Sequence, residues 1–186
     1  MDFFEYILII TSVIYAMAVA QIMSGISRIA QSIGETRVYL AHSIWVLNLF
    51  VYIFLIWWAG WEFRSVQWTF PQYGYVLVAP TLLFFTCSLL VPQNISGSSL
   101  DLEEHFFRIR RPLCWSFFLA SVFAAADGNV LSDEPLWHQG RFGHLIVLGA
   151  PLFGAFSTSR RLHNAVAIAL LIGIIFIIVT RFWNPR

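Results

Sequence analysis

Residues 162–182 read LHNAVAIALLIGIIFIIVTRF, and this run decides the class of fold because Arg181 is its only charged side chain. A helix over this range is about 30 Å long, which is also the approximate thickness of the hydrocarbon core of a bilayer. We therefore interpret the segment as a membrane span.

The rest of the chain has the same character. The 186-residue sequence is 59% hydrophobic and 11% charged, whereas soluble domains average about 45–50% apolar and about 25% charged residues. A soluble fold of this size leaves too much surface in water to hide this surplus of apolar side chains, but a bilayer can cover it. The lipid bilayer is the expected partner, and a formal net charge of +1 gives no indication of nucleic acid.

Six apolar segments are long enough, or nearly so, to cross a bilayer: residues 3–23, 38–61, 75–92, 112–131, 142–157 and 162–182. The fifth is the shortest and contains Pro151. We expect helices, because backbone polar groups must be paired inside lipid and none of the segments alternates with a period of two. The predicted fold class is all-α, a polytopic membrane bundle of six transmembrane helices that forms one integral membrane domain over residues 1–186.

The most charged stretch is DLEEHFFRIRRP, residues 101–112. Asp101 is a plausible helix N-cap, with Glu104 at the third helical position. Apolar residues recur at helical spacing and make one stripe: Leu102, Phe106, Ile109 and Leu113. We expect a short cytoplasmic amphipathic helix that lies on the membrane surface and leads into the fourth span at Pro112.

The arginines of this stretch, Arg108, Arg110 and Arg111, are expected to contact anionic lipid head groups or a partner protein. The alternative is a metal or acid–base site made by Asp101, Glu104 and His105. Ligand-type residues on one exposed helix often coincide by chance, so the surface helix is the favoured interpretation.

The distribution of arginine predicts the orientation, since loops rich in basic residues stay in the cytoplasm. With both termini outside, the seven cytoplasmic arginines are Arg28, Arg37, Arg108, Arg110, Arg111, Arg160 and Arg161, and four others lie outside. We therefore predict a multi-pass protein of a bacterial inner membrane with periplasmic N- and C-termini.

Small residues at intervals of four mark helix faces that can approach closely in membranes. The first, fourth, fifth and sixth spans carry such rows, for example Ala120 and Ala124 in the fourth. The second and third spans carry bulky residues instead. This pattern predicts a tight core of spans one, four, five and six, with the other two more peripheral.

Intramembrane polar residues usually mark functional sites. Glu5, Asp127 and His144 are each expected near the outer end of a span, and we predict that they form a polar cup open to the outside. His138, in the adjoining loop, is a further candidate. Gln21 and Asn48 are expected to bond to neighbouring helices. The alternative is that the cup residues simply lie in the wet interface.

Three segments resemble parts of a group of small, uncharacterised bacterial six-span inner-membrane proteins: residues 18–29, 42–63 and 101–112 (AVAQIMSGISRI, HSIWVLNLFVYIFLIWWAGWEF and DLEEHFFRIRRP). The resemblance covers most of the chain and implies the six-span fold, but it implies no activity.

No HExxH, CxxC, GxSxG or phosphate-loop motif occurs, so neither a cofactor nor a metal ion is implied and an enzyme is the least favoured class. Two classes remain open. One is a small transporter or channel, proton-linked and acting through the outward polar cup, as a homo-oligomer. The other is a non-catalytic scaffold or sensor that assembles with further membrane subunits.

Overall fold

The computed structural model describes residues 2–92, 100–132 and 141–183, and these residues are almost entirely helical. The seven α-helices are α1 (Phe3–Gln31), α2 (Leu40–Ala59), α3 (Phe70–Val76), α4 (Val78–Leu90), α5 (Leu102–Leu131), α6 (Arg141–Phe156) and α7 (Arg160–Ile177). The shorter elements are η1 (Ile33–Glu35), β1 (Thr36–Arg37), η2 (Gly60–Phe63), β2 (Leu100–Asp101) and η3 (Ile178–Phe182), the last of which is a π-helical turn.

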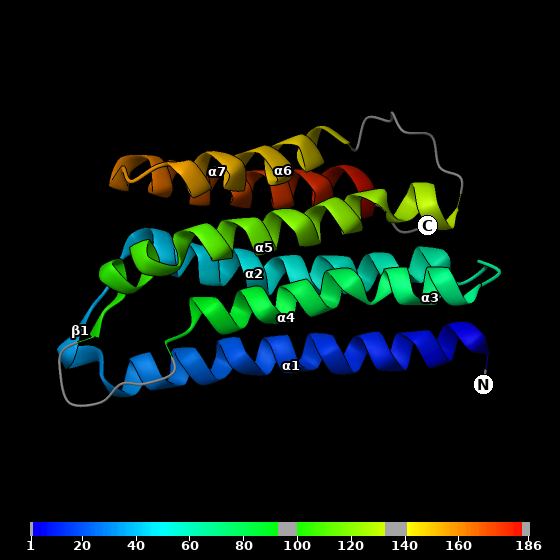
Figure 1. The fold of residues 1–186 in the computed structure, drawn as a ribbon, viewed down its shortest axis with the longest axis horizontal. Coiled ribbons are helices and arrows are strands. Elements are labelled where there is room, and N and C mark those ends of the chain that lie inside the picture. Colours follow the sequence, from blue (N-terminus) through cyan, green and yellow to red (C-terminus); the bar gives the residue numbers. More distant parts are fainter. Residues whose placement is uncertain (1, 93–99, 133–140, 184–186) are drawn as a thin grey trace.

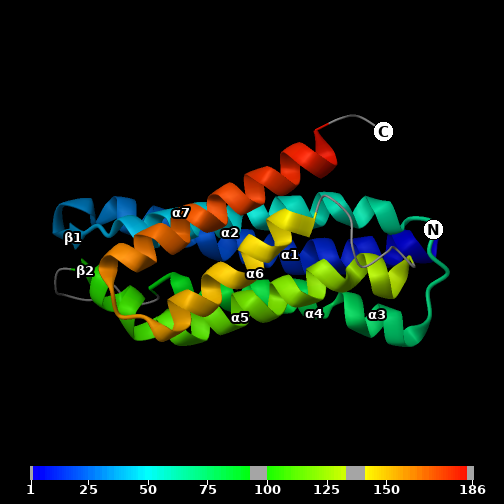
Figure 2. The same cartoon turned by 90° about the horizontal axis from the view of Figure 1, so that it is seen from above.

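The helices lie lengthwise in an elongated bundle (Figure 1). With α3 and α4 taken as one broken helix, six helical passes lie along the bundle, so that α1 begins and η3 ends at one end and β1 lies at the other. We call these the terminal end and the β1 end. Figure 2 shows α7 crossing the other helices obliquely. At the β1 end, β1 and β2 pair in parallel, with Thr36 opposite Leu100.

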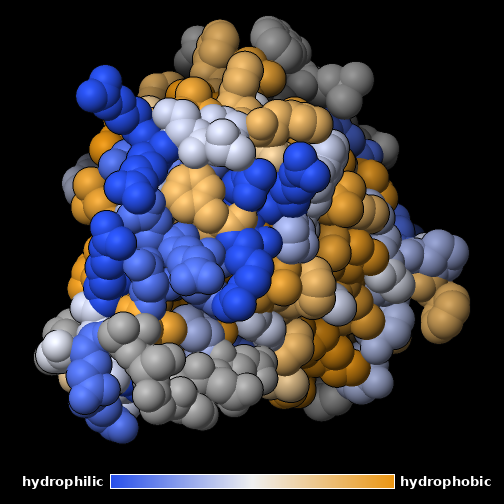
Figure 3. Space-filling view, turned by 60° about the vertical axis from the view of Figure 1, so that its left-hand side comes forward, coloured by the Kyte–Doolittle hydropathy of each residue, from blue (hydrophilic) through white to orange (hydrophobic). Residues whose placement is uncertain are grey.

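Within the described residues, five helical segments are long and apolar enough to cross a membrane: Phe3–Gln31, Leu40–Phe63, Phe70–Leu90, Leu102–Leu131 and Arg160–Phe182. The sixth pass, α6, has 16 residues and is therefore only about 24 Å long. Figure 3 shows hydrophilic side chains gathered on the β1 end and apolar side chains over the flank of the bundle. This distribution suits a helical protein embedded in a membrane.

Polar side chains cap the helices at their N-termini, where the first backbone N–H groups have no partner inside the helix. Asp2 and Glu5 form a capping box on α1. Asp101 caps α5, as the sequence predicted, and accepts hydrogen bonds from the backbone N–H groups of Glu103 at 2.9 Å and Glu104 at 3.0 Å. Ser159 caps α7.

The stretch at residues 101–112 does not form the separate surface helix that the sequence suggested. It is the first third of α5, which continues through Pro112 to Leu131. Leu102, Phe106 and Leu113 are at most 1% exposed, so their stripe packs inside the bundle. The same stripe continues at helical spacing into the fourth span, and one continuous helix keeps Leu102, Phe106 and Leu113 buried and Ile109 partly buried.

The centre of the bundle also differs from the prediction. The second span, α2, packs against α1, α4, α5 and α7, whereas α1 packs chiefly against α4 and α2. Trp45, Leu49 and Tyr52 of α2 are at most 2% exposed. The expectation that spans two and three are peripheral is therefore wrong, because a helix surrounded by others needs large side chains to fill the space between them.

A close approach through small residues occurs between α6 and α7, where Gly173 belongs to the row predicted for the sixth span but Gly143 belongs to no predicted row. A side chain at Gly143 would meet Ile177 Cγ1 at 2.5 Å and the Gly173 carbonyl oxygen at 3.0 Å. These two glycines let the helices touch along their backbones. The contact holds the short helix α6 against α7.

Candidate functional site

A cleft opens at the terminal end of the bundle. Its volume is about 50 Å³, enough for only a few water molecules. Its walls come from α2, η2, α5, α6, α7 and η3, which are far apart in the sequence. Four charged or imidazole side chains line it: Glu62, Asp127, His144 and Arg181.

An ion pair closes one side of this cleft. Arg181 Nη2 donates to Glu62 Oε2 at 2.6 Å, and the two side chains are 18% and 16% exposed. Glu62 lies on η2, directly after α2, and Arg181 lies on η3, directly after α7. The pair therefore joins the terminal ends of two helices. Charges this far from water are costly unless they are paired, so each side chain depends on the other.

Asp127 lies on the last turns of α5 and is partly buried. Its carboxylate is within hydrogen-bonding reach of the Tyr75 hydroxyl and lies in the field of the Arg181 guanidinium. The Tyr75 hydroxyl donates at 2.8 Å to the Phe123 carbonyl oxygen. The same hydroxyl can instead donate to an ionised Asp127, or its oxygen can accept from a protonated Asp127 while the Phe123 bond is kept.

Asp127 also borders a second cavity of about 40 Å³ between α1, α2 and the α3–α4 segment. The side chains on its other walls that carry a polar atom are Thr11, Tyr15, Trp57 and Trp68. The carboxylate thus stands between two small cavities, at the point where α5 meets the helices on both sides.

The structure brings together two of the three residues predicted to form the polar cup. Asp127 and His144 line the same cleft. Glu5 is exposed, and its Oε2 accepts from the Asp2 backbone N–H at 2.9 Å in the capping box of α1. Its neighbours Phe4, Ile7 and Leu8 line the second cavity, but Glu5 does not line either one.

No family model matches this chain, and neither a curated protein nor a solved structure matches it. The likeness to small six-span bacterial proteins therefore stays a resemblance of sequence pattern.

Sequence reasoning missed the ion pair of the cleft. Glu62 and Arg181 are single charges of opposite sign, each at the end of a long apolar segment. Both segments run from the β1 end to the terminal end, so both charges lie at the same depth. Two opposite charges at the same depth are a signal from which the ion pair could have been predicted. The sequence alone did not indicate that α2 and α7 are neighbours.

The other polar residues that the sequence singled out, Gln21, Asn48 and His138, lie in different environments. Asn48 is fully buried, and its Nδ2 donates to the Ala167 carbonyl oxygen of α7 at 2.8 Å, so the predicted bond between helices is present. Gln21 lies half-buried on α1. His138 lies outside the described residues.

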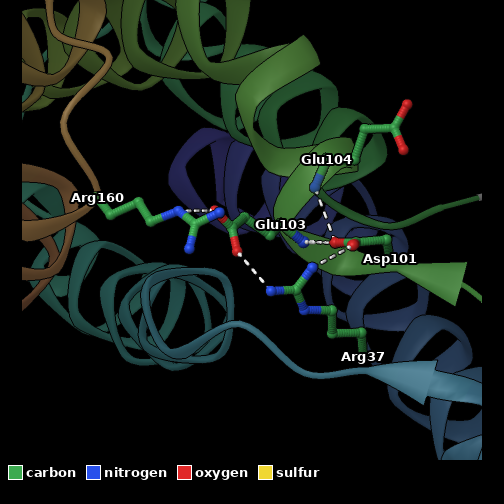
Figure 4. A network of polar contacts seen from close by, with 5 residues as sticks. All are labelled: Arg37, Asp101, Glu103, Glu104 and Arg160. Atoms are coloured by element: carbon green, nitrogen blue, oxygen red, sulfur yellow. Dashed lines mark hydrogen bonds and ion pairs between the residues drawn. The ribbon is translucent and has the colours of Figure 1, made fainter.

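A second polar cluster occupies the β1 end (Figure 4). Arg37 Nη1 pairs with Asp101 Oδ2 at 3.1 Å, and Arg37 Nη2 lies 3.8 Å from Glu103 Oε2. Glu103 also pairs with Arg160 at the start of α7. These contacts tie the α1–α2 connection to α5 and α7. Hydrogen bonds from the Glu104 and Glu103 N–H groups, together with Arg37, lower the pKa of the Asp101 carboxyl.

The three arginines assigned to lipid head groups have separate environments. Arg110 turns inward, and its Nε donates to the Ser157 carbonyl oxygen at 3.1 Å. Arg108 Nη2 lies 3.4 Å from His105 Nδ1. Arg111 is exposed. Contact with lipid or a partner stays a prediction for these residues.

The proposed metal or acid–base alternative at the β1 end also has a structural outcome. Asp101 is engaged as the helix cap, and His105 Nε2 bonds to the Leu90 carbonyl oxygen at 3.1 Å. Within residues 2–92, 100–132 and 141–183, no three His, Cys, Asp or Glu side chains lie close enough together to hold a metal ion.

Proposed function

We propose that this chain is a small proton-linked membrane transporter or channel, in which Asp127 binds and releases the proton. One observation carries the proposal: Asp127 lines a cleft together with the Glu62–Arg181 ion pair and with His144 of the shorter helix α6. Asp127, Glu62 and Arg181 belong to helical segments long enough to cross a membrane. Ionisable side chains at such positions commonly belong to ion paths and proton relays.

The charges of the cleft provide a coupling mechanism. Arg181 pairs with Glu62 and also acts on the carboxylate of Asp127. An ionised Asp127 competes with Glu62 for the guanidinium of Arg181. A protonated Asp127 no longer attracts Arg181, which then pairs with Glu62 alone, and the Asp127 carboxyl donates a hydrogen bond to Tyr75. Protonation therefore changes how firmly η2 is held to the end of α7, and this contact forms one wall of the cleft.

The size of the cleft limits what passes in this conformation. A volume of about 50 Å³ admits water and protons, and a larger solute requires the cleft to open. Loosening the Glu62–Arg181 pair is the movement that opens it. The arginine-rich β1 end favours a cytoplasmic position for that end, so the cleft faces the periplasm in this proposal.

The experiment is proton flux into vesicles reconstituted with the purified protein, with a pH-sensitive dye inside and an imposed pH gradient. Wild-type protein is expected to move protons, and Asp127→Asn, which cannot exchange a proton, is expected to abolish the flux while the protein stays folded. Glu5→Gln is the matched control, because it removes a carboxylate at the same end, outside the cleft, and glutamine still completes a capping box.

An equal flux for wild type and Asp127→Asn would contradict the proposal. Vesicles that show no flux above protein-free vesicles would favour the alternative class, a scaffold or sensor subunit that assembles with other membrane proteins.

A further inference from the structure

The second cavity combines aromatic walls with a single carboxylate. Its volume is about 40 Å³. The aromatic residues on its walls are Phe4, Tyr15, Trp57, Phe63 and Trp68. Among the lining residues that the structure describes, Asp127 is the only charged one, and none is basic. The cavity therefore presents a negative charge inside an aromatic enclosure.

The charges around Asp127 do not balance. On the walls of the two cavities, the charged residues that the structure describes are Glu62, Asp127 and Arg181. Arg181 lines the cleft, where its Nη2 pairs with Glu62 Oε2 at 2.6 Å, so the guanidinium already neutralises one carboxylate. The negative charge of an ionised Asp127 is then left for a proton or another cation to neutralise.

The polar atoms of the second cavity suit a hydrogen-bond donor. Thr11 Oγ1 donates its proton to the Ile7 carbonyl oxygen at 3.0 Å, so the hydroxyl oxygen is left as an acceptor. Trp57 Nε1 donates to Ser12 Oγ at 2.9 Å and Trp68 Nε1 is buried, so neither N–H opens on the cavity. An ammonium group has N–H donors and no acceptor, which matches these walls.

The aromatic rings favour a positive charge for a further reason. The face of an aromatic ring is negative and attracts cations, and the attraction is stronger away from water. Phe4 and Phe63 are each 7% exposed, so a cation in this cavity is shielded from solvent. An anion is repelled by the carboxylate of Asp127, and the cavity therefore selects a cation.

The volume of the cavity limits the size of that cation. One water molecule needs about 10–15 Å³ of such a cavity, so about 40 Å³ holds about three water-sized groups. Ethylammonium has one nitrogen and two carbon atoms and is about this large. Its ethyl group can pack against Ile7 and Leu8, which are apolar residues of α1 on the cavity wall.

We propose that the second cavity binds a small organic ammonium ion, which replaces the proton on Asp127 and is the solute that the transporter exchanges for protons. As the ion binds, the O–H bond of the Asp127 carboxyl breaks and its proton leaves to water. The carboxylate oxygens then accept hydrogen bonds from the ammonium N–H groups. One positive charge enters as one leaves, so the net charge of the site does not change. The role of the ion as a transported solute rests on the proposed function, whereas the binding site itself rests on the cavity.

Competition between the ion and the proton makes binding depend on pH. Lowering the pH protonates Asp127 and is expected to weaken the binding of the ammonium ion. Other titratable or charged groups face Asp127 from the surrounding elements: Tyr15 of α1, Tyr52 of α2, Glu62 of η2, Tyr75 of α3, His144 of α6 and Arg181 of η3. Protonation of His144 adds a positive charge in the neighbouring cleft and acts in the same direction, so the pH dependence is interpreted only together with Asp127→Asn.

The test is isothermal titration calorimetry of the purified protein in detergent, with ethylammonium chloride as the probe, at a series of pH values. Sodium chloride in excess keeps the ionic strength constant. Wild type is expected to bind one ion, more weakly as the pH falls. Ethanol, which has the same number of non-hydrogen atoms but no charge, and Asp127→Asn are each expected to weaken binding about tenfold or more.

A matched pair of tryptophan variants tests the aromatic walls. Trp68→Leu removes a ring from the cavity and is expected to weaken ethylammonium binding about threefold or more. Trp58→Leu removes a ring that is 63% exposed and lines neither cavity, and it is expected to keep the wild-type affinity. Thermal unfolding confirms that each variant is folded, and Asp127→Asn decides the outcome if Trp68→Leu is not.

Equal affinities for ethylammonium in wild type and Asp127→Asn overturn the site, as do equal affinities for ethylammonium and ethanol. An equal loss in Trp68→Leu and Trp58→Leu overturns it as well. If reconstituted vesicles carry proton flux that depends on Asp127 but ethylammonium does not bind, the site is overturned and the proposed function stands. If ethylammonium binds through Asp127 and the vesicles carry no flux, the site stands and the proposed function falls.

Discussion

The ion pair of the cleft makes an asymmetric prediction about stability. Glu62→Gln leaves Arg181 close to Asp127, whose carboxylate can partly neutralise the charge of the guanidinium. Arg181→Met instead leaves two carboxylates, Glu62 and Asp127, beside each other in a partly buried cleft without this guanidinium. The loss of the arginine is therefore expected to destabilise the fold more than the loss of the glutamate.

The burial of the Glu62–Arg181 pair determines how much stability each substitution is expected to cost. Exposed ion pairs contribute about 0.2–1 kcal/mol, and breaking a buried one costs about 3–5 kcal/mol. With side chains 16% and 18% exposed and a bond of 2.6 Å, this pair is close to the buried limit. We expect Arg181→Met to lower the free energy of unfolding by about 2–4 kcal/mol and Glu62→Gln by about 1–2 kcal/mol.

The assay is equilibrium unfolding in mixed micelles, with denaturing detergent as the titrant and tryptophan fluorescence as the signal. The double variant Glu62→Gln/Arg181→Met completes the cycle and is expected to be more stable than Arg181→Met alone, because it removes one of the two carboxylates. If Glu62→Gln proves as destabilising as Arg181→Met, or the double variant is the least stable of the three, Arg181 does not serve both acids and the coupling mechanism is wrong.

Three further predictions concern the frame that holds the cleft. Gly143→Ala is expected to lower the unfolding temperature, at a cost of about 1–3 kcal/mol, because the new Cβ lies 2.5 Å from Ile177 Cγ1. Gly149→Ala, on the same helix, has open space around it and should stabilise the fold by about 0.5–1 kcal/mol. Equal shifts of the unfolding temperature in the two variants would disprove the contact between α6 and α7. Because the fold lowers the pKa of Asp101, the ionised carboxylate stabilises the fold at pH values above the ordinary pKa of an aspartate, about 3.9. This stabilisation is lost as the pH falls through the lowered pKa. Acid should therefore reduce the melting temperature more in wild type than in Asp101→Asn. Ala120→Leu, at a position with no exposed surface, should destabilise by about 1–3 kcal/mol, and a melting temperature unchanged in detergent would mean that α5 is not tightly packed there.

The sequence predicted the helices well because their cause is local. Long apolar runs such as residues 162–182 determine a membrane helix without reference to any other segment. The cap at Asp101 was predicted for the same reason, since a short acidic side chain before a helical pattern satisfies backbone groups only two or three residues away.

The arrangement of the helices was harder to predict, because it depends on volume shared between distant segments. Bulky side chains on α2 were interpreted as a sign that this span is peripheral, but Trp45 and Leu49 fill the centre of the bundle. Pro112 was interpreted as a helix start, but the apolar stripe on both sides of it is continuous, and that continuity was visible in the sequence. The β1–β2 pairing joins Arg37 to Asp101, which no local pattern indicates.

The candidate site was predicted in part. Asp127 and His144 share a cleft because their spans end at the same depth, which can be judged from span lengths alone. Glu62 and Arg181 were missed because their pairing requires α2 and α7 to be neighbours. The depth of a residue in the membrane is thus predictable from one sequence, whereas the helices that lie next to each other around the bundle axis are not.

The protonation of Asp127 itself gives the most direct test of the account. Infrared difference spectra of the protein in vesicles, recorded as the external pH is stepped, report a carboxylic acid group that gains or loses its proton. We predict a carboxyl band that responds to the pH step, disappears in Asp127→Asn and remains in Glu5→Gln. A spectrum in which that band persists in Asp127→Asn would contradict the central claim that Asp127 exchanges the proton.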